Sequence, residues 1–134
     1  MNAVDTSVAV AALVSWHVAH DVSRAAAAGT VIPAHARLET YSVLTRMPPP
    51  HRLGPAVVAD LLERWFPAAR TLVPSDGLAR DIVRRCCEAG IGGGAVYDAL
   101  VGLTAAERGA VLVSRDVRAA RTYRRLGLEV DSLP

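Results

Sequence analysis

Two short apolar segments, far apart in the chain, each lead into a carboxylate. Residues 1–4 end at Asp5, and residues 110–113 continue through Ser114 and Arg115 to Asp116. An apolar run that ends on an acid is typical of a buried strand in a parallel sheet, and open α/β folds build their sites at the carboxyl ends of such strands. If both strands lie centrally, the two acids meet, which is unfavourable unless a cation lies between them. The pattern therefore predicts an acidic pocket.

Two further acids are expected near this pocket. Asp98 lies in the segment 95–103, where every neighbour is apolar, glycine or tyrosine. A lone carboxylate on so apolar a helix is costly unless it is paired or bound to a cation. Glu39 lies on a predicted helix that directly follows a strand, so its first two turns should lie near the same sheet edge as Asp5. Most of the remaining acids fit solvated helix faces or helix termini.

Four converging carboxylates would form a hard-oxygen cation site, which suits Mg²⁺ or Mn²⁺. The chain contains no lysine that could neutralise them instead. A bound ion of this kind lowers the pKa of a water ligand and screens an attacked phosphate, so the chemistry indicated is phosphodiester hydrolysis. The residues leave open whether one or two ions bind.

The elements that must position these acids alternate between strands and helices. Strands are predicted at 1–4, 30–32, 71–73, 110–114 and 128–130. Helices are predicted at 7–14, 19–28, 33–46, 55–66, 76–89 and 95–108, with an arginine-rich helix after Asp116 and with Thr6 or Ser7 capping the first. This alternation predicts an α/β fold with a mostly parallel sheet of four to five strands and helices on both faces.

Length and composition are consistent with that fold. A chain of 134 residues with 51% hydrophobic residues predicts a single domain, residues 1–134. The adjacent Cys86 and Cys87 have neither metal-ligand nor disulfide spacing, as expected in a reducing compartment. Without a signal peptide or a long apolar run, the protein is expected to be cytoplasmic and without membrane contact. A net charge of +2 is compatible with a polyanionic partner.

Four motifs together carry a family resemblance. They are Asp-Thr-Ser at residues 5–7, Glu39 on the helix after the second strand, Gly-Gly-Gly-Ala-Val-Tyr-Asp-Ala-Leu at 92–100 and Leu-Val-Ser-Arg-Asp at 112–116. In this order the chain resembles the PIN-domain ribonucleases, and among them the VapC toxins of bacterial type II toxin–antitoxin pairs. The resemblance extends from Asp5 to about Val130 and implies a PIN-like three-layer α/β/α sandwich.

The resemblance also implies an activity. It points to a Mg²⁺- or Mn²⁺-dependent endoribonuclease acting on structured RNA such as tRNA or rRNA. The acidic quartet that it implies, catalytic and metal-binding, consists of Asp5, Glu39, Asp98 and Asp116. The positions that it implies as supporting the pocket are Thr6, Ser7 and Ser114, the last of which replaces a commoner threonine and keeps the hydroxyl.

The implied partners are RNA, a second copy of the chain and a protein inhibitor. A homodimer, or a larger toxin–antitoxin assembly, is expected, with a cognate VapB-type antitoxin whose C-terminal segment covers the acidic pocket. Candidate contacts to RNA phosphate are Arg46, Arg115 and Arg118. The arginines of the last helix form either a basic rim or an ordinary solvated face.

Other features have plainer interpretations. His17 and His20 have one-turn spacing, but without a third ligand they are expected to be solvated helix residues. The glycine-rich segment 90–95 follows a predicted helix rather than a strand, so it lacks the context of a dinucleotide-binding motif.

Three alternative functions are weighed against the ribonuclease. A haloacid-dehalogenase-type phosphatase would use Asp5 as nucleophile, but it needs a second aspartate where this chain has Ser7, and a lysine that this chain lacks. A phosphoacceptor receiver domain also uses acids at strand ends, but it needs a lysine at the end of its last strand, which this chain lacks. A non-catalytic RNA- or protein-binding module with the same fold stays open. It predicts metal-independent RNA binding and no effect of substituting the acids.

Overall fold

The computed structural model describes all of residues 1–134 and contains five parallel strands. The strands β1 (Asn2–Val4), β4 (Val111–Ser114) and β5 (Val130–Ser132) form one sheet, and β2 (Ile32–Pro33) pairs with β3 (Thr71–Leu72). A parallel bridge from Ala3 to Val31 joins the two sheets, and the Val4 amide donates to the Val31 carbonyl at 3.0 Å. The strands therefore follow the order β3-β2-β1-β4-β5. This agrees with the mostly parallel sheet predicted from the sequence.

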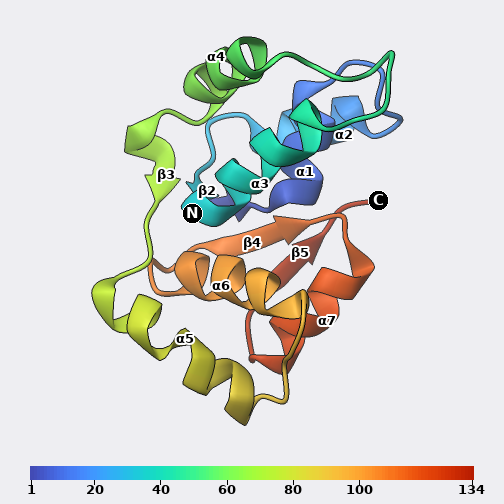
Figure 1. The fold of residues 1–134 in the computed structure, drawn as a ribbon. Helices are drawn as coiled ribbons and strands as arrows, with labels where there is room; N and C mark the ends of the chain where they lie inside the picture. The colour runs from blue at the N-terminus through green and yellow to red at the C-terminus, as the bar shows by residue number, and fades with distance from the viewer.

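Every connection between consecutive strands contains at least one helix, because parallel strands must be joined by a crossover. Helices α1 (Thr6–Leu13) and α2 (His20–Ala27) join β1 to β2. The next connection contains α3 (Ala34–Thr45), α4 (Pro55–Trp65) and a 3₁₀ turn, and the third contains α5 (Asp76–Glu88) and α6 (Ala95–Ala106). Helix α7 (Val117–Arg125) joins β4 to β5. In Figure 1, α1 to α4 lie above β4, and α5 to α7 lie below it.

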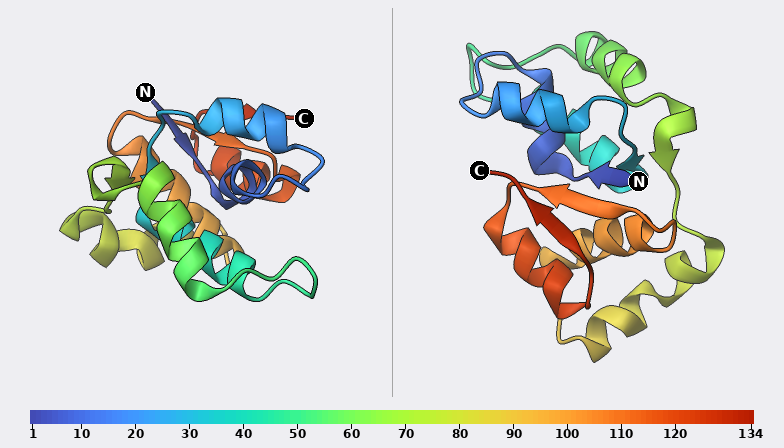
Figure 2. Two further views of the ribbon diagram at one scale, coloured as in Figure 1. Left: turned by 90° about the horizontal axis from the view of Figure 1, so that it is seen from above. Right: turned by 180° about the vertical axis from the view of Figure 1, so that it is seen from behind.

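The strand order reverses between β1 and β4. From β1 the chain moves outward to β2 and β3, and then it returns to place β4 and β5 on the other side of β1. The right-hand view of Figure 2 shows β4 and β5 from behind, with the long return through α5 on the outside. In open α/β sheets this reversal leaves a crevice at the carboxyl ends of the two strands. Asp5 and Asp116 follow these two strand ends.

The main core is aliphatic, as the low aromatic content requires. It groups 21 buried residues, most of them alanine, valine and leucine. Five consecutive residues of α1, Val8 to Ala12, are buried, which matches the prediction of a helix that is apolar all round. The largest fully buried side chains are Tyr123 and Phe66. The core thus fixes α1 and α7 against β4, from opposite ends of the sequence.

Two predicted details are wrong. Asp5, rather than Thr6 or Ser7, caps the first helix, since its Oδ1 accepts the amide of Ser7 at 3.0 Å. The last strand begins at Val130 instead of residue 128. Residues 127 and 128 still belong to the turn that closes α7, in which the residue-128 amide donates to the Tyr123 carbonyl at 2.9 Å.

The structure also bears on the two cysteines and on the question of a membrane span. Cys86 is buried and Cys87 exposed, and both thiols are free. No helix has the length and hydropathy that would let it cross a bilayer.

The packing of α6 against α7 predicts that G102A destabilises the protein. A Cβ at Gly102 would lie 2.8 Å from Cδ1 of Tyr123 and 2.7 Å from Cδ1 of Leu128. Alanine gains about 1 kcal/mol of helix propensity, whereas overpacking costs about 1–3 kcal/mol. Both approaches are shorter than 3 Å and the buried Tyr123 ring cannot move freely, which places the overpacking cost in the upper part of this range. We therefore expect the free energy of unfolding in urea to fall by about 1–2 kcal/mol. G92A, whose Cβ meets nothing within 4 Å, is the control. An equal or higher stability of G102A would contradict this packing.

Candidate active site

Asp5 is the most constrained acid of the chain. Its side chain follows β1 directly, and the residue is only 4% exposed. Its Oδ1 accepts the Ser7 hydroxyl at 2.5 Å and the Val8 amide at 3.3 Å, while its Oδ2 accepts the Tyr123 hydroxyl at 3.1 Å. Burial raises the pKa of Asp5, and hydrogen bonds from Ser114, Ser7 and Tyr123 oppose that rise. The carboxylate is therefore held in one orientation.

Asp116 follows β4 and, like Asp5, caps the helix that comes next. Its Oδ1 accepts the amides of Arg118 at 2.9 Å and Ala119 at 3.2 Å, and so caps α7. Its own amide donates to the Ser114 hydroxyl at 3.1 Å. The positive ends of two helix dipoles, α1 and α7, therefore favour negative charge at the two strand ends.

Hydroxyl groups connect the segments that carry the acids. The Ser7 hydroxyl donates to Asp5 and accepts the amide of Arg115 at 2.8 Å, which joins the ends of β1 and β4. Thr6 Oγ1 donates to the carbonyl of Ala36 at 3.4 Å, which joins α1 to α3. The three hydroxyl residues predicted as supporting, Thr6, Ser7 and Ser114, thus all lie beside the acids, and Ser114 is buried.

Asp98 and Glu39 come from helices on the sides of the crevice. Asp98 lies in the first turn of α6 and is partly buried. Burial, followed by the charges of Asp116, Glu39 and Asp5, raises its pKa to about 6, and Arg118 opposes this rise. Glu39 lies in the middle of α3, with its Oε2 3.8 Å from Nε2 of His35.

One cavity of about 300 Å³ brings the four acids together. Its lining includes Asp5, Glu39, Asp98 and Asp116, with Thr6, Ser7 and Arg115. Arg118 lines an adjoining cavity that also contains Asp98 and Asp116. Arg46 lines neither of these cavities, and its role in binding RNA stays a prediction.

The prediction that His17 is a solvated helix residue is wrong. It lies in the turn between α1 and α2 rather than on a helix, and it lines the acidic cavity. Its Nδ1 accepts the amide of Ala19 at 3.0 Å. Burial, together with the charges of Arg115 and His20, lowers the pKa of His17. His20 begins α2, and its Nδ1 lies 3.0 Å from the carbonyl of Ala11. No local signal predicts these contacts, because they depend on how α2 folds back on α1.

Tyr123 is a second residue whose role the sequence did not predict. It is 1% exposed and donates to Asp5 from the far end of the chain. Burial and the charge of Asp5 raise the pKa of Tyr123 well above its usual range, so the hydroxyl keeps its proton. The available signal was a lone tyrosine among arginines, seven residues after Asp116 and hence near it in helical phase.

The cavity suits a hydrated divalent cation better than a dehydrated one. No three histidine, cysteine, aspartate or glutamate side chains are close enough to ligate one ion directly. Mg²⁺ usually keeps several waters and is held by one or two carboxylates. Six waters of about 30 Å³ each occupy roughly 180 Å³, less than the volume of the cavity. The oxygen donors of Asp5, Glu39, Asp98 and Asp116 therefore fit Mg²⁺ or Mn²⁺ held partly through water.

Comparison with known proteins identifies the family. The sequence model of the PIN domain matches residues 3–125. The chain is 46% identical over 132 residues to Ribonuclease VapC40 of Mycobacterium tuberculosis, with 98% of each chain covered. It is also 46% identical over 130 residues to Ribonuclease VapC27 of Mycobacterium tuberculosis, covering 96% of this chain and 93% of the relative. The chain therefore belongs to the PIN-domain family, as a VapC-type ribonuclease.

Solved structures confirm the fold. FitAB bound to an IR36 DNA fragment is similar with a TM-score of 0.69 and 17% identity, covering 98% of this chain and 94% of that one. FitAcB from Neisseria gonorrhoeae is similar with a TM-score of 0.70 and 16% identity, covering 97% and 96%. The α/β fold predicted from the sequence is thus shared over nearly the whole chain.

The contact between Tyr123 and Asp5 predicts that Y123F destabilises the protein. The substitution removes a buried donor to a carboxylate, which costs about 1.5–3 kcal/mol. Urea unfolding at pH 7 measures the loss. Y97F is the matched control, because Tyr97 is 53% exposed and its hydroxyl makes no hydrogen bond within the chain. Equal losses in the two variants would show that the Asp5 contact contributes nothing.

The raised pKa of Asp98 predicts a pH-dependent effect of D98N without divalent cations. An aspartate with a pKa of about 6 in the fold and an ordinary one of 3.8 when unfolded loses stability as pH rises through that interval. D98N removes this penalty. Its melting temperature in EDTA should exceed that of the unmodified protein at pH 7.5, with the difference shrinking toward pH 4. D21N, at an exposed position of α2, is the control. A gain that does not grow with pH would refute the prediction.

Proposed function

We propose that the chain is the toxin of a type II toxin–antitoxin pair, and that it hydrolyses RNA phosphodiester bonds with Mg²⁺ or Mn²⁺. The observation that carries the proposal is the convergence of four carboxylates, from four separate segments, on one cavity where the strand order reverses. Two relatives with 46% identity are named ribonucleases, which supports RNA as the substrate. Structured RNA such as tRNA or rRNA is the substrate class we infer.

Like-charge crowding is the physical reason to expect a cation. Burial, followed by the charges of Asp116, Glu39 and Asp5, raises the pKa of Asp98. Arg118 opposes this rise, and the chain has no lysine that could add to its effect. A divalent ion held by Asp5, Glu39, Asp98 and Asp116 would remove this repulsion. When bound, it would supply an activated water and screen the charge of the attacked phosphate.

The residues around the acids hold them in place. Asp5 and Asp116 each use one oxygen to cap a helix, so their positions are fixed by α1 and α7. Tyr123 and Ser7 orient the Asp5 carboxylate from two directions. Glu39 is less constrained, with 41% of its side chain exposed, and it lies on α3 across the cavity. It is the acid best able to adjust when substrate enters.

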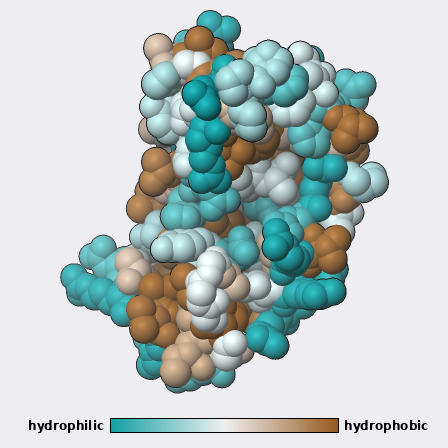
Figure 3. Space-filling view, turned by 45° about the vertical axis from the view of Figure 1, so that its right-hand side comes forward, coloured by the Kyte–Doolittle hydropathy of each residue, from teal (hydrophilic) through white to brown (hydrophobic).

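A VapB-type antitoxin and a second copy of the chain are the protein partners we infer. An entirely apolar groove of about 470 Å³ lies between α5 and α6, and two of its residues, Val83 and Tyr97, are 78% and 53% exposed. Hydrophobic surface also gathers at the lower left of the face shown in Figure 3. Exposed apolar surface of this kind supports a protein interface.

Cleavage of a labelled RNA by the purified chain tests the proposed function. We expect activity with Mg²⁺ or Mn²⁺ and none in EDTA. D98N and E39Q should reduce kcat/KM by about 100-fold or more, as expected for a charged group at a reacting centre, and should relieve growth inhibition.

D21N serves as the control, because it removes a carboxylate outside the cavity. Cleavage in EDTA, or undiminished cleavage by D98N, would contradict the mechanism. Metal-independent RNA binding without cleavage would instead favour the non-catalytic module. Hydrolysis of a simple phosphate ester by the purified chain would instead support the alternative function of a phosphatase.

A further inference from the structure

A second cavity, of about 770 Å³, lies beside the acidic one and has the opposite charge. One wall is the exposed face of α7, and the other is the loop before α6. Its charged lining residues are all arginines, namely Arg118, Arg121, Arg124 and Arg125. We call this cavity the arginine groove.

The arginine groove is continuous with the acidic cavity. A third cavity of about 350 Å³ lies between them. It shares Ala95, Arg118 and Thr122 with the arginine groove, and it shares Asp98 and Asp116 with the acidic cavity. A chain-like ligand could therefore extend from the acids along α7 without leaving a concave surface. Hydrophilic surface runs from the middle of the face in Figure 3 toward its lower right.

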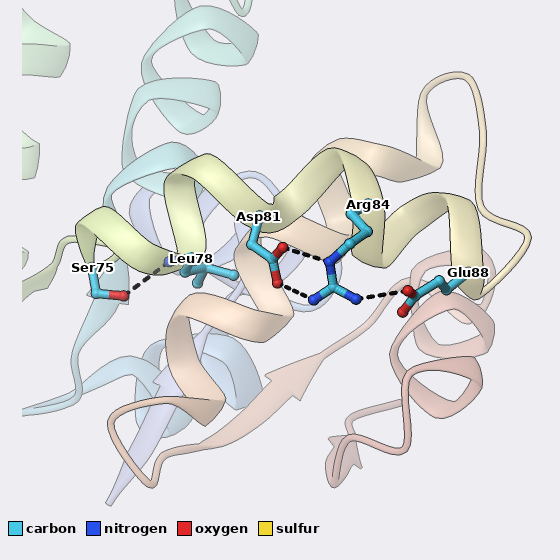
Figure 4. A network of polar contacts seen from close by, with 5 residues as sticks. All are labelled: Ser75, Leu78, Asp81, Arg84 and Glu88. Carbon is cyan, nitrogen blue, oxygen red and sulfur yellow. Dashed lines mark hydrogen bonds and ion pairs between the residues drawn. The ribbon is translucent and has the colours of Figure 1, made fainter.

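The arginines of α7 form no direct ion pair with an acid. The arginine ion pairs of this chain involve Arg37, Arg64 and Arg84, and none involves α7. Arg84 of α5 shows the contrast, because it bonds to both Asp81 and Glu88 (Figure 4). On α7, only Arg125 contacts the wall, with its Nη1 donating to the Gly90 carbonyl at 3.2 Å.

The arginines along α7 are spaced in a way that suits the phosphates of a nucleic-acid backbone. The buried face of the helix contains Ala119, Ala120 and Tyr123, and the arginines occupy the exposed face. From Arg118 to Arg125 the helix rises by about 10 Å at 1.5 Å per residue. In a nucleic-acid duplex each strand advances about 3.4 Å along the axis per phosphate, so this length can face a few successive phosphates.

We propose that the arginine groove binds the RNA backbone on one side of the scissile phosphate and guides that strand into the acidic cavity. This inference rests on the proposed function. Arginine forms bidentate contacts with phosphate, and it keeps its charge at all physiological pH values. An acidic protein segment is the competing occupant. The lining disfavours it, because only two of the nine lining residues are hydrophobic, whereas protein interfaces depend on buried apolar anchors.

The first test removes charge at Arg121 and Arg124, which lie outside the acidic cavity. Binding of a fluorescent RNA oligonucleotide is measured by anisotropy in EDTA, so that no cleavage occurs, over a series of salt concentrations. R121Q/R124Q should bind at least about 10-fold more weakly. Loss of two phosphate contacts should also reduce the slope of log K against log salt by about 1.4.

The matched control is R64Q/R80Q. It removes the same net charge from two exposed positions that do not line the groove. Its salt slope should equal that of the unmodified protein. Melting temperatures within about 2 °C of one another establish that all variants fold, as expected for surface substitutions.

The second test blocks the groove instead of removing its charge. A Cβ at Gly92 meets nothing within 4 Å, so G92E should fold while placing a carboxylate in the groove. G54E is the control, because Gly54 is equally open and lies outside the groove. We expect G92E, and not G54E, to weaken RNA binding at least about 10-fold, through repulsion of phosphate.

The outcomes separate this inference from the proposed function. If the groove variants bind RNA like their controls while metal-dependent cleavage persists, the groove assignment is wrong and the ribonuclease stands. If the unmodified protein neither binds nor cleaves RNA, both fail. If the groove variants bind RNA normally but lose binding to the antitoxin encoded by a neighbouring reading frame, the groove is a protein interface and the inference is overturned.

Discussion

The proposed site depends on keeping four carboxylates together in one cavity although they repel one another. Hydroxyl donors, helix N-termini and, near Asp98, the charge of Arg118 all reduce their mutual repulsion. Asp5 and Asp116 cap α1 and α7, so two helix dipoles favour their negative charge. Tyr123 and Ser7 add hydroxyl donors to Asp5. Asp98 lies at neither strand end, and burial, followed by the charges of Asp116, Glu39 and Asp5, raises its pKa to about 6.

The sheet topology makes this concentration of charge possible. Because the strand order reverses between β1 and β4, no helix crosses the carboxyl ends of these two strands. Each strand then turns into its helix within one or two residues, so the acid at the turn has almost no freedom to move away. Gly102 lets α7 approach α6 closely, and this approach brings Tyr123 to Asp5.

The sequence predicted the acids better than their surroundings. Asp5 and Asp116 follow from apolar runs that end on a carboxylate, and Asp98 follows from its apolar neighbours; the resemblance added weight to Glu39. The position of His17 and the bond from Tyr123 to Asp5 were not predicted. Both depend on tertiary packing between segments that carry no local signal for it. The same holds for the arginine groove, because a charged helix face alone does not reveal which surface lies opposite.

Helix α7 connects the two charged regions. Asp116 lies at its N-terminus, and Arg124 and Arg125 lie in its last turn, so both charges agree with the helix dipole and stabilise the helix without a ligand. A polyanion would be attracted along the arginines and repelled at the acids. On the proposed function, a divalent cation held by Asp5, Glu39, Asp98 and Asp116 would offset this repulsion where the phosphate meets the acids. On the proposed function and the groove assignment, α7 would contribute to holding the strand through its arginines, and Asp116 at its N-terminus would contribute to cutting it.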